Sequence, residues 1–160
     1  VTDSKERGFS MYAVKHASGN DMERLQRFLS IADGAYQHID PSISHFFFVE
    51  EIEKQKIVGT VGLELHQLIG ILRSFVIDGS VSDARIGFAL IGAVLAYARN
   101  LSVRKLVLFT NSEPFFEKIG FQKVPFDLLP KVVLETEYAN QVKNYGIPMV
   151  VDCQKSDRNV

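Results

Sequence analysis

The chain has 160 residues, of which 46% are hydrophobic and 23% charged, and its formal net charge is −1. This length suits one domain, so we expect a single domain over residues 1–160, with a core at about 11–151 and polar ends. A net charge so near zero provides no broad basic surface, so neither nucleic acid nor a membrane surface is an expected partner.

Neither a signal peptide nor a membrane span is expected. The first ten residues are polar and lack the apolar stretch of a signal peptide. The longest apolar run, residues 86–98, is shorter than the roughly 18 residues that a span requires. The single cysteine, Cys153, cannot form an internal disulfide, which fits a reducing compartment. We therefore expect a cytoplasmic protein.

The first predicted elements are a strand and a helix. Residues 11–17 alternate between apolar and polar side chains, which predicts a strand. Residues 18–35 predict a helix, in which Asn20 is the N-cap and Glu23 completes a capping box. Gly34 is the expected end of this helix. Its apolar face consists of Met22, Leu25, Phe28, Leu29 and Ala32.

Three strands and a long helix follow. The strands are predicted at 45–53, 56–65 and 68–78, and tight turns between them predict an antiparallel meander. Residues 82–101 then predict a helix that is apolar on nearly every side and therefore buried. A buried strand at 104–110 completes a crossover whose outer strands are parallel.

The last part of the chain continues to alternate between helix and strand. Ser112 is the expected N-cap of a short helix, with Pro114 in its first turn. Pro130 falls in the first turn of a later helical segment, where proline is tolerated. The predicted elements are a helix at 112–119, a strand at 120–124, a mainly helical segment at 127–142 and a strand at 147–153. The fold class is therefore mixed α/β.

The order of these elements and two local motifs resemble the GNAT N-acetyltransferases. "VGTVGLELHQLIGILRSFVID" (58–78) is similar to the third and fourth strands of that fold, and "NSEPFFEKIGFQKV" (111–124) to its fourth helix and flanking strands. The likeness covers residues 11–151 and is greatest to the branch of amino-acid N-acetyltransferases that includes arsenic-resistance acetyltransferases. It implies a mostly antiparallel central sheet with splayed fourth and fifth strands, helices on both faces, and acetyl-CoA as co-substrate without a metal.

The resemblance implies that the pyrophosphate of acetyl-CoA binds at the start of the long helix, where backbone N–H groups lack helical partners. The family pattern there, Q/R-x-x-G-x-G/A, falls on Ser82, Asp83, Ala84, Arg85, Ile86 and Gly87, and only Gly87 matches it well. The carboxylate of Asp83 would repel a pyrophosphate unless Arg85 offsets it or the side chain turns to solvent. Read alone, the segment is an ordinary helix start with Ser82 as N-cap.

Five further residues contact the co-substrate by the same resemblance. The backbone groups of Phe75, Val76 and Ile77 would bind the pantetheine arm, and the amide of Val76 would polarise the thioester. Asn111 matches a coenzyme-A-contacting asparagine of the family, although a helix-entry turn explains it equally well. Phe116 occupies the position at which many relatives have a tyrosine that acts as the general acid. A phenylalanine cannot donate a proton, so this proton donor is missing.

Three residues are predicted to be catalytic. Glu64 is the expected base, acting through water or on the ammonium group of the acceptor, and the alternative is a solvent-facing strand residue. His66 titrates near neutrality, and the alternative is an exposed turn histidine. Arg73 lies among apolar residues, so it needs a partner, which is either an acceptor carboxylate or a structural carboxylate. Cys153 is expected to be a small buried residue rather than a nucleophile.

Two functions follow from the resemblance. The first is acetyl transfer from acetyl-CoA to the primary amine of a small molecule, with an amino acid as one acceptor. The second is a catalytically impaired protein of the same fold that serves as a ligand-binding or dimeric interaction module, which the altered loop and Phe116 favour. A homodimer is compatible with either function.

Overall fold

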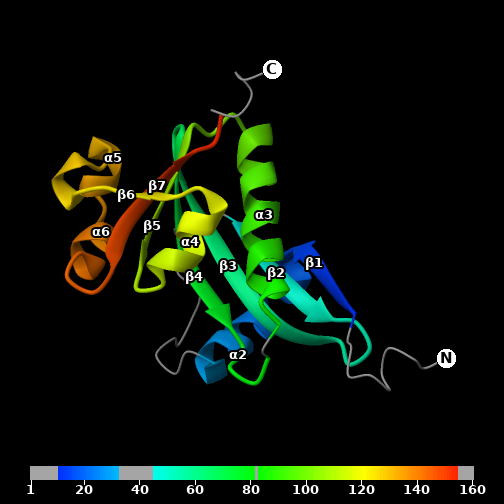
Figure 1. Cartoon of the computed structure of the whole chain (residues 1–160). Coiled ribbons are helices and arrows are strands. Elements are labelled where there is room, and N and C mark those ends of the chain that lie inside the picture. Colours follow the sequence, from blue (N-terminus) through cyan, green and yellow to red (C-terminus); the bar gives the residue numbers. More distant parts are fainter. Residues whose placement is uncertain (1–10, 33–44, 82, 155–160) are drawn as a thin grey trace. The chain divides into compact units, whose positions relative to one another are not determined.

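The computed structural model describes residues 11–32, 45–81 and 83–154. Its elements in chain order are β1 (Tyr12–His16), the 3-10 helix η1 (Gly19–Asp21), α2 (Met22–Ala32), β2 (His45–Glu51), β3 (Lys56–His66), β4 (Ile69–Ile77), α3 (Arg85–Asn100), β5 (Lys105–Thr110), α4 (Glu113–Ile119), β6 (Gln122–Lys123), the 3-10 helix η2 (Phe126–Leu128), α5 (Lys131–Leu134), α6 (Glu137–Val142) and β7 (Ile147–Asp152) (Figure 1).

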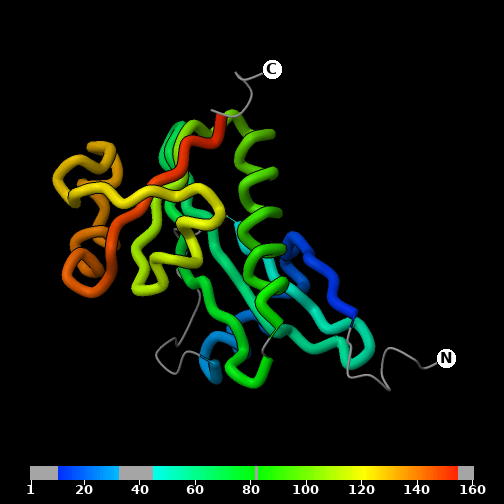
Figure 2. The backbone as a smooth tube through the Cα atoms, viewed as in Figure 1, coloured from blue at the N-terminus to red at the C-terminus, as the bar shows by residue number. Residues whose placement is uncertain are grey.

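The strands of the described residues join in the order β1-β2-β3-β4-β5-β7-β6. β4 and β5 are parallel, as the predicted crossover requires, whereas β1 with β2, β5 with β7, and β6 with β7 are antiparallel. Figure 2 follows the chain through this order. The mixed α/β class with a mostly antiparallel sheet is confirmed.

Two compact units make up the chain, and they are interleaved in the sequence. The first unit comprises residues 1–62 and 74–94, and the second comprises 63–73 and 95–160. β3, β4 and α3 each contribute residues to both units. No helix in the described part of the chain has the length and apolar character that crossing a membrane requires.

The core of the first unit has helices on two faces of its strands. Leu25 and Leu29 of α2 pack with a cluster that includes Phe48 of β2. The next residue of β2, Val49, points the other way and lines a cavity with Ile86 of α3. α2 and the first half of α3 therefore cover opposite faces of these strands (Figure 1).

The N-terminus of the first helix differs from the prediction. Ser18, not Asn20, is the cap, and its backbone N–H donates to the carboxylate of Asp21 at 2.8 Å. A 3-10 turn over Gly19–Asp21 follows this cap and precedes α2, which begins at Met22. Of the predicted apolar face, Ala32 is exposed, and the predicted end of the helix at Gly34 lies outside the described residues.

The core of the second unit centres on β4, β5 and the last helices. Ile71 and Val107 pack with Val133 of α5 and Ala139 of α6. Cys153 is fully buried, and burial raises the pKa of its thiol to about 11. The prediction of a small buried cysteine is therefore confirmed.

The segment 127–142 is mainly helical, as predicted, but it is divided into separate short elements, and the predicted place of Pro130 is wrong. Pro130 has no N–H to donate and stands as the N-cap of the short α5 instead of inside a first turn. Thr136 then begins a separate helix, because its Oγ1 accepts the backbone N–H of Ala139 at 3.1 Å. The sequence here encodes two caps, so the segment forms two short helices after a 3-10 turn.

Candidate active site

A hairpin in the second unit brings the three predicted catalytic residues together. β3 ends at His66, Gln67 turns the chain with a φ of 58°, and β4 begins at Ile69. Glu64 lies in the last part of β3 and Arg73 in the middle of β4. The tight turn therefore places a carboxylate, an imidazole and a guanidinium close to one another.

Glu64 is the centre of this group. Its Oε1 accepts a hydrogen bond from Nη1 of Arg73 at 2.7 Å, and its Oε2 lies 2.5 Å from Nε2 of His66. The side chains of Glu64 and Arg73 are only 6% and 10% exposed, whereas that of His66 is 26% exposed. The alternative of a solvent-facing Glu64 is therefore wrong, and the expectation that Arg73 needs a partner is confirmed.

An aromatic residue that the sequence analysis missed covers the same group. The guanidinium of Arg73 lies 4.0 Å from the ring centroid of Tyr138 in α6. The Tyr138 ring also meets Phe109 of β5 edge-on, with centroids 6.1 Å apart. These contacts hold the planar cation on a fixed aromatic surface. No local sequence motif predicts this contact, because it joins residues of β4 and α6 that are distant in the sequence.

The geometry divides the chemical roles within this group. Both oxygens of Glu64 already have donors, so its carboxylate is poorly placed to accept a proton from a substrate. When His66 carries its proton on Nε2, it donates to Glu64 and leaves Nδ1 as an acceptor. In this tautomer the buried carboxylate fixes the orientation of His66, the most exposed member, and Arg73 balances the charge of that carboxylate.

At the start of α3, in the first unit, the carboxylate of Asp83 already binds groups that an anionic ligand could use. Asp83 Oδ1 accepts the backbone N–H of Arg85 at 3.0 Å and its Nε at 2.9 Å, and Asp83 Oδ2 accepts Nη2 at 2.6 Å. These bonds from Arg85 hold the pKa of Asp83 at about 2. The backbone N–H of Ile86 donates to the carbonyl of Asp83 at 3.1 Å.

Two of the amides expected to face a pyrophosphate therefore have partners in this structure, those of Arg85 and Ile86. α3 begins at Arg85, later than the predicted residue 82, with Asp83 rather than a serine accepting an amide of its first turn. Ala84 is exposed and Gly87 is buried. The predicted cap and loop residue Ser82 lies outside the described residues.

β4 is distorted immediately before the three residues predicted to bind pantetheine. Ser74 has a φ of 55°, which is unusual for a residue other than glycine inside a strand. Its carbonyl accepts a hydrogen bond at 3.0 Å from Oγ1 of Thr60, which is fully buried. Phe75, Val76 and Ile77 follow and are partly exposed. The sequence carries no glycine or proline that would have signalled this distortion.

The parallel ladder between β4 and β5 is short. Within the described residues of the second unit it pairs Ile69 to Ile71 with Lys105 to Val107, although β5 continues to Thr110. A ladder that ends early is what splayed strands require. Asn111 follows β5 directly and is exposed. Phe116 is 3% exposed and meets Phe121 edge-on, with ring centroids 5.6 Å apart, so its side chain belongs to the packing of the second unit.

A protein-family comparison identifies the class to which this fold belongs. The model of the acetyltransferase (GNAT) family matches residues 12–121, which is well over half of the chain. The chain therefore belongs to the acetyltransferase (GNAT) family. No curated protein is similar enough in sequence to count as a match. The described residues contain no group of three or more His, Cys, Asp or Glu side chains that could hold a metal ion.

Solved structures agree with this family at the level of the fold. N-acetylglutamate synthase from Neisseria gonorrhoeae, solved with coenzyme A and N-acetyl-glutamate, has a TM-score of 0.70 at 21% identity, over 90% of this chain and 35% of that chain. Rv2747 from Mycobacterium tuberculosis, solved with coenzyme A, gives 0.67 at 18% identity, over 88% and 98% of the two chains. An acetyltransferase of the GNAT family from Staphylococcus aureus Mu50 gives 0.69 at 19% identity, over 89% and 99%. The chain thus spans about a third of the synthase and nearly all of the other two.

Proposed function

We propose that this protein transfers an acetyl group from acetyl-CoA to the primary amine of a small molecule, with an amino acid as one candidate acceptor. Family membership supports acetyl transfer, and the fold neighbours with bound coenzyme A support its use here. The observation that carries the proposal is the buried Glu64 that is bonded to both Arg73 and the more exposed His66. A histidine oriented by a carboxylate is suited to take a proton from an ammonium group.

His66 is the proposed base. The acceptor ammonium loses one proton to His66, and its neutral nitrogen attacks the thioester carbonyl to form the N–C bond. The C–S bond then breaks, and the attached nitrogen loses its second proton to solvent. The backbone amide of Val76 polarises the carbonyl oxygen. Because Phe116 cannot donate a proton, the thiolate leaves directly and takes its proton from water. Glu64 is then a positioning residue rather than the base.

Arg73 also has a positioning role in this proposal. Its guanidinium is held by Glu64 and covered by Tyr138, which makes it less suited to bind an acceptor carboxylate than the sequence suggested. It holds Oε1 of Glu64, whose Oε2 in turn orients His66.

Three segments of the chain would hold the co-substrate. Backbone groups of Phe75 to Ile77 bind the pantetheine arm, and the segment Ser82 to Gly87 binds the pyrophosphate. Asn111 contributes an amide side chain. Asp83 must release Arg85 for the phosphates, because its carboxylate now holds the amide and guanidinium that they would use.

The test is thiol release from acetyl-CoA over a panel of amino acids and simple amines. We expect turnover on at least one amine and a fall in kcat of about 10²- to 10⁴-fold for His66→Gln. His16→Gln changes an exposed histidine of β1 and serves as the matched control, with turnover unchanged. Equal turnover by the wild type and the His66 variant would remove the proposed base.

The second function is a module that binds a ligand or forms a dimer without catalysis. The ion pair of Asp83 with Arg85 at the start of α3, and the phenylalanine at position 116, favour it. Calorimetry with acetyl-CoA and desulfo-CoA separates the two functions. Tight binding of both ligands without turnover on any amine supports the module, and no binding at millimolar ligand excludes the enzyme.

A further inference from the structure

A cavity of about 580 Å³ lies in the first unit beside the second half of α2. The start of β3 and the loop after β4 form its other walls. Its volume is typical of sites that hold small organic ligands. Part of its lining is apolar and comes from Phe28, Ile31 and Ile57. Ile31 is 78% exposed, which is a high value for a large apolar side chain on a helix.

The remaining lining of this cavity is mainly cationic. Arg24 and Arg27 contribute from α2, and Lys56 from the first residue of β3. Asp78 is the one carboxylate among the described residues that line it. The lining therefore has an excess of positive charge, although the whole chain carries a net charge of −1.

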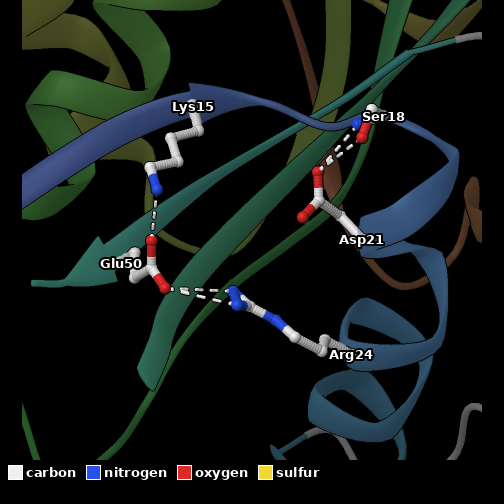
Figure 3. Close-up of polar contacts among 5 residues, drawn as sticks. All are labelled: Lys15, Ser18, Asp21, Arg24 and Glu50. Carbon is white, nitrogen blue, oxygen red and sulfur yellow. Dashed lines mark hydrogen bonds and ion pairs between the residues drawn. The ribbon is translucent and has the colours of Figure 1, made fainter. Parts of the chain in front are cut away.

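Arg24 is fixed in place by a buried carboxylate. Its Nη1 and Nη2 donate to Oε2 of Glu50 at 3.2 and 3.3 Å, while Nζ of Lys15 donates to Oε1 at 2.6 Å (Figure 3). Glu50 is only 5% exposed. Two cations thus share one carboxylate, so this cluster keeps a positive charge, and its arginine is already ordered at the wall of the cavity.

The carboxylate of Asp78 is occupied by its own loop. Its Oδ1 accepts the backbone N–H of Ser80 at 3.0 Å and the hydroxyl of Ser80 at 3.1 Å. Its Oδ2 lies 3.5 Å from Nζ of Lys56. The bond from the Ser80 amide is the largest cause that lowers the pKa of Asp78. Among the described residues, Arg27 forms an ion pair with Glu23 at 3.5 Å, and the side chains of both are largely exposed.

We propose that this cavity binds an organic anion that joins a carboxylate, or a similar acid group, to an aromatic or branched aliphatic body. The apolar body lies against Phe28, Ile31 and Ile57, and the acid group meets Arg27 and Lys56, whose present ion pairs are long and solvent-exposed. Arg24 adds a third, pre-ordered cation. The site is independent of acetyl transfer, and a protein without turnover tests it equally well.

The test uses the fluorescence of 8-anilinonaphthalene-1-sulfonate, an aromatic sulfonate, in a chain that contains no tryptophan. We expect saturable binding to the folded protein, with competition by 4-phenylbutyrate. The matched neutral alcohol, 4-phenylbutan-1-ol, should compete at least about fivefold more weakly, because it lacks the charge that the cations attract. Equal competition by the acid and the alcohol would show that the cations play no part and would overturn the proposal.

The double variant Arg27→Gln/Lys56→Gln locates the site. We expect it to weaken sulfonate binding about five- to tenfold, since each partly screened charge contributes a small factor. Lys118→Gln/Lys131→Gln removes two exposed charges of the second unit and should leave affinity unchanged. Circular dichroism shows whether each variant is folded. If both folded double variants bind the sulfonate as the wild type does, or if both weaken it equally, the cavity is not the site.

Discussion

At the scale of single residues, the contacts of Asp83 bear on how an anion could bind at the start of α3. Its carboxylate takes the first-turn amide and the guanidinium of Arg85, which are the groups that a pyrophosphate would use. The side chain was expected to repel the ligand. Its contacts indicate direct competition instead, because the helix N-terminus and Arg85 are already neutralised from within the chain.

Replacing Asp83 with Asn should tighten acetyl-CoA binding. The change removes the negative charge and frees Arg85, and the gain should be largest at low salt, where charges are least screened. Isothermal titration calorimetry at two salt concentrations measures it, with Asp127→Asn in the second unit as the control. Unchanged or weaker affinity would mean that the ligand does not bind at the start of α3.

The lowered pKa of Asp83 also predicts how protein stability and acetyl-CoA affinity should depend on pH. Its pKa in the folded protein is lowered from 3.8 to about 2, so the carboxylate is charged at every ordinary pH. The stability that its bonds contribute is fully present above about pH 4 and is lost as the pH falls towards 2. Acetyl-CoA affinity between pH 5 and 8 should therefore show no step from Asp83.

Glu64 and Arg73 form a pair whose members should not be removed singly. Glu64→Ala would leave the cation of Arg73 buried with its carboxylate removed, and we expect a loss of about 3–5 kcal/mol in the free energy of unfolding. Glu64→Ala/Arg73→Met should recover part of that loss, because no buried charge remains. Urea unfolding of the wild type, the two single variants Glu64→Ala and Arg73→Met, and the double variant gives the double-mutant cycle. Additive effects of the two substitutions would contradict a coupled pair.

At the scale of elements, one glycine of β3 and one glycine of α3 lead to opposite expectations for substitution by alanine. A Cβ on Gly59 of β3 would lie 2.9 Å from Cδ1 of Ile77 and 3.1 Å from Cδ1 of Leu90 in α3, so the glycine allows the helix to approach the strand. A Cβ on Gly92, within α3, would meet no atom within 4 Å.

Gly59→Ala should therefore destabilise the protein by about 1–3 kcal/mol through overpacking. Gly92→Ala should stabilise it by roughly 0.5–1 kcal/mol, because alanine is the better helix former. Thermal unfolding of the two variants beside the wild type measures both effects. A stabilising Gly59→Ala would show that α3 does not pack against β3 as described.

At the scale of the whole molecule, the sequence predicted the order of elements well because apolar periodicity is a local property. The strand-helix-strand crossover from β4 through α3 to β5 follows from such patterns. The division of the segment 127–142 at Pro130 and Thr136 was not predicted, because its helical pattern looks continuous in the sequence. In the structure, Pro130 and Thr136 each act as the N-cap of a short helix. The cap at Ser18 was missed because Asn20 and Glu23 offered an equally plausible box.

The sequence indicated which residues make up the candidate site better than it indicated how those residues contact one another. Glu64, His66 and Arg73 were named from their positions at a strand end, a turn and an apolar strand. The roles proposed for them, as base, positioning carboxylate and counter-charge, depend on which oxygen contacts which nitrogen, and no sequence pattern carries that information. Tyr138 and the distorted Ser74 depend on tertiary contact and backbone strain, so they too became visible only in the structure.

The central claim is acetyl transfer with His66 as base, and a pH profile of kcat/KM tests it most directly. Acetyl-CoA and the best amine of the panel are the substrates, and mass spectrometry follows the acetylated product. The wild type should gain activity as the pH rises through the titration of one group, and His66→Gln should lose that rise together with most of its rate. A product formed at the same rate and with the same pH profile by both proteins would contradict the account.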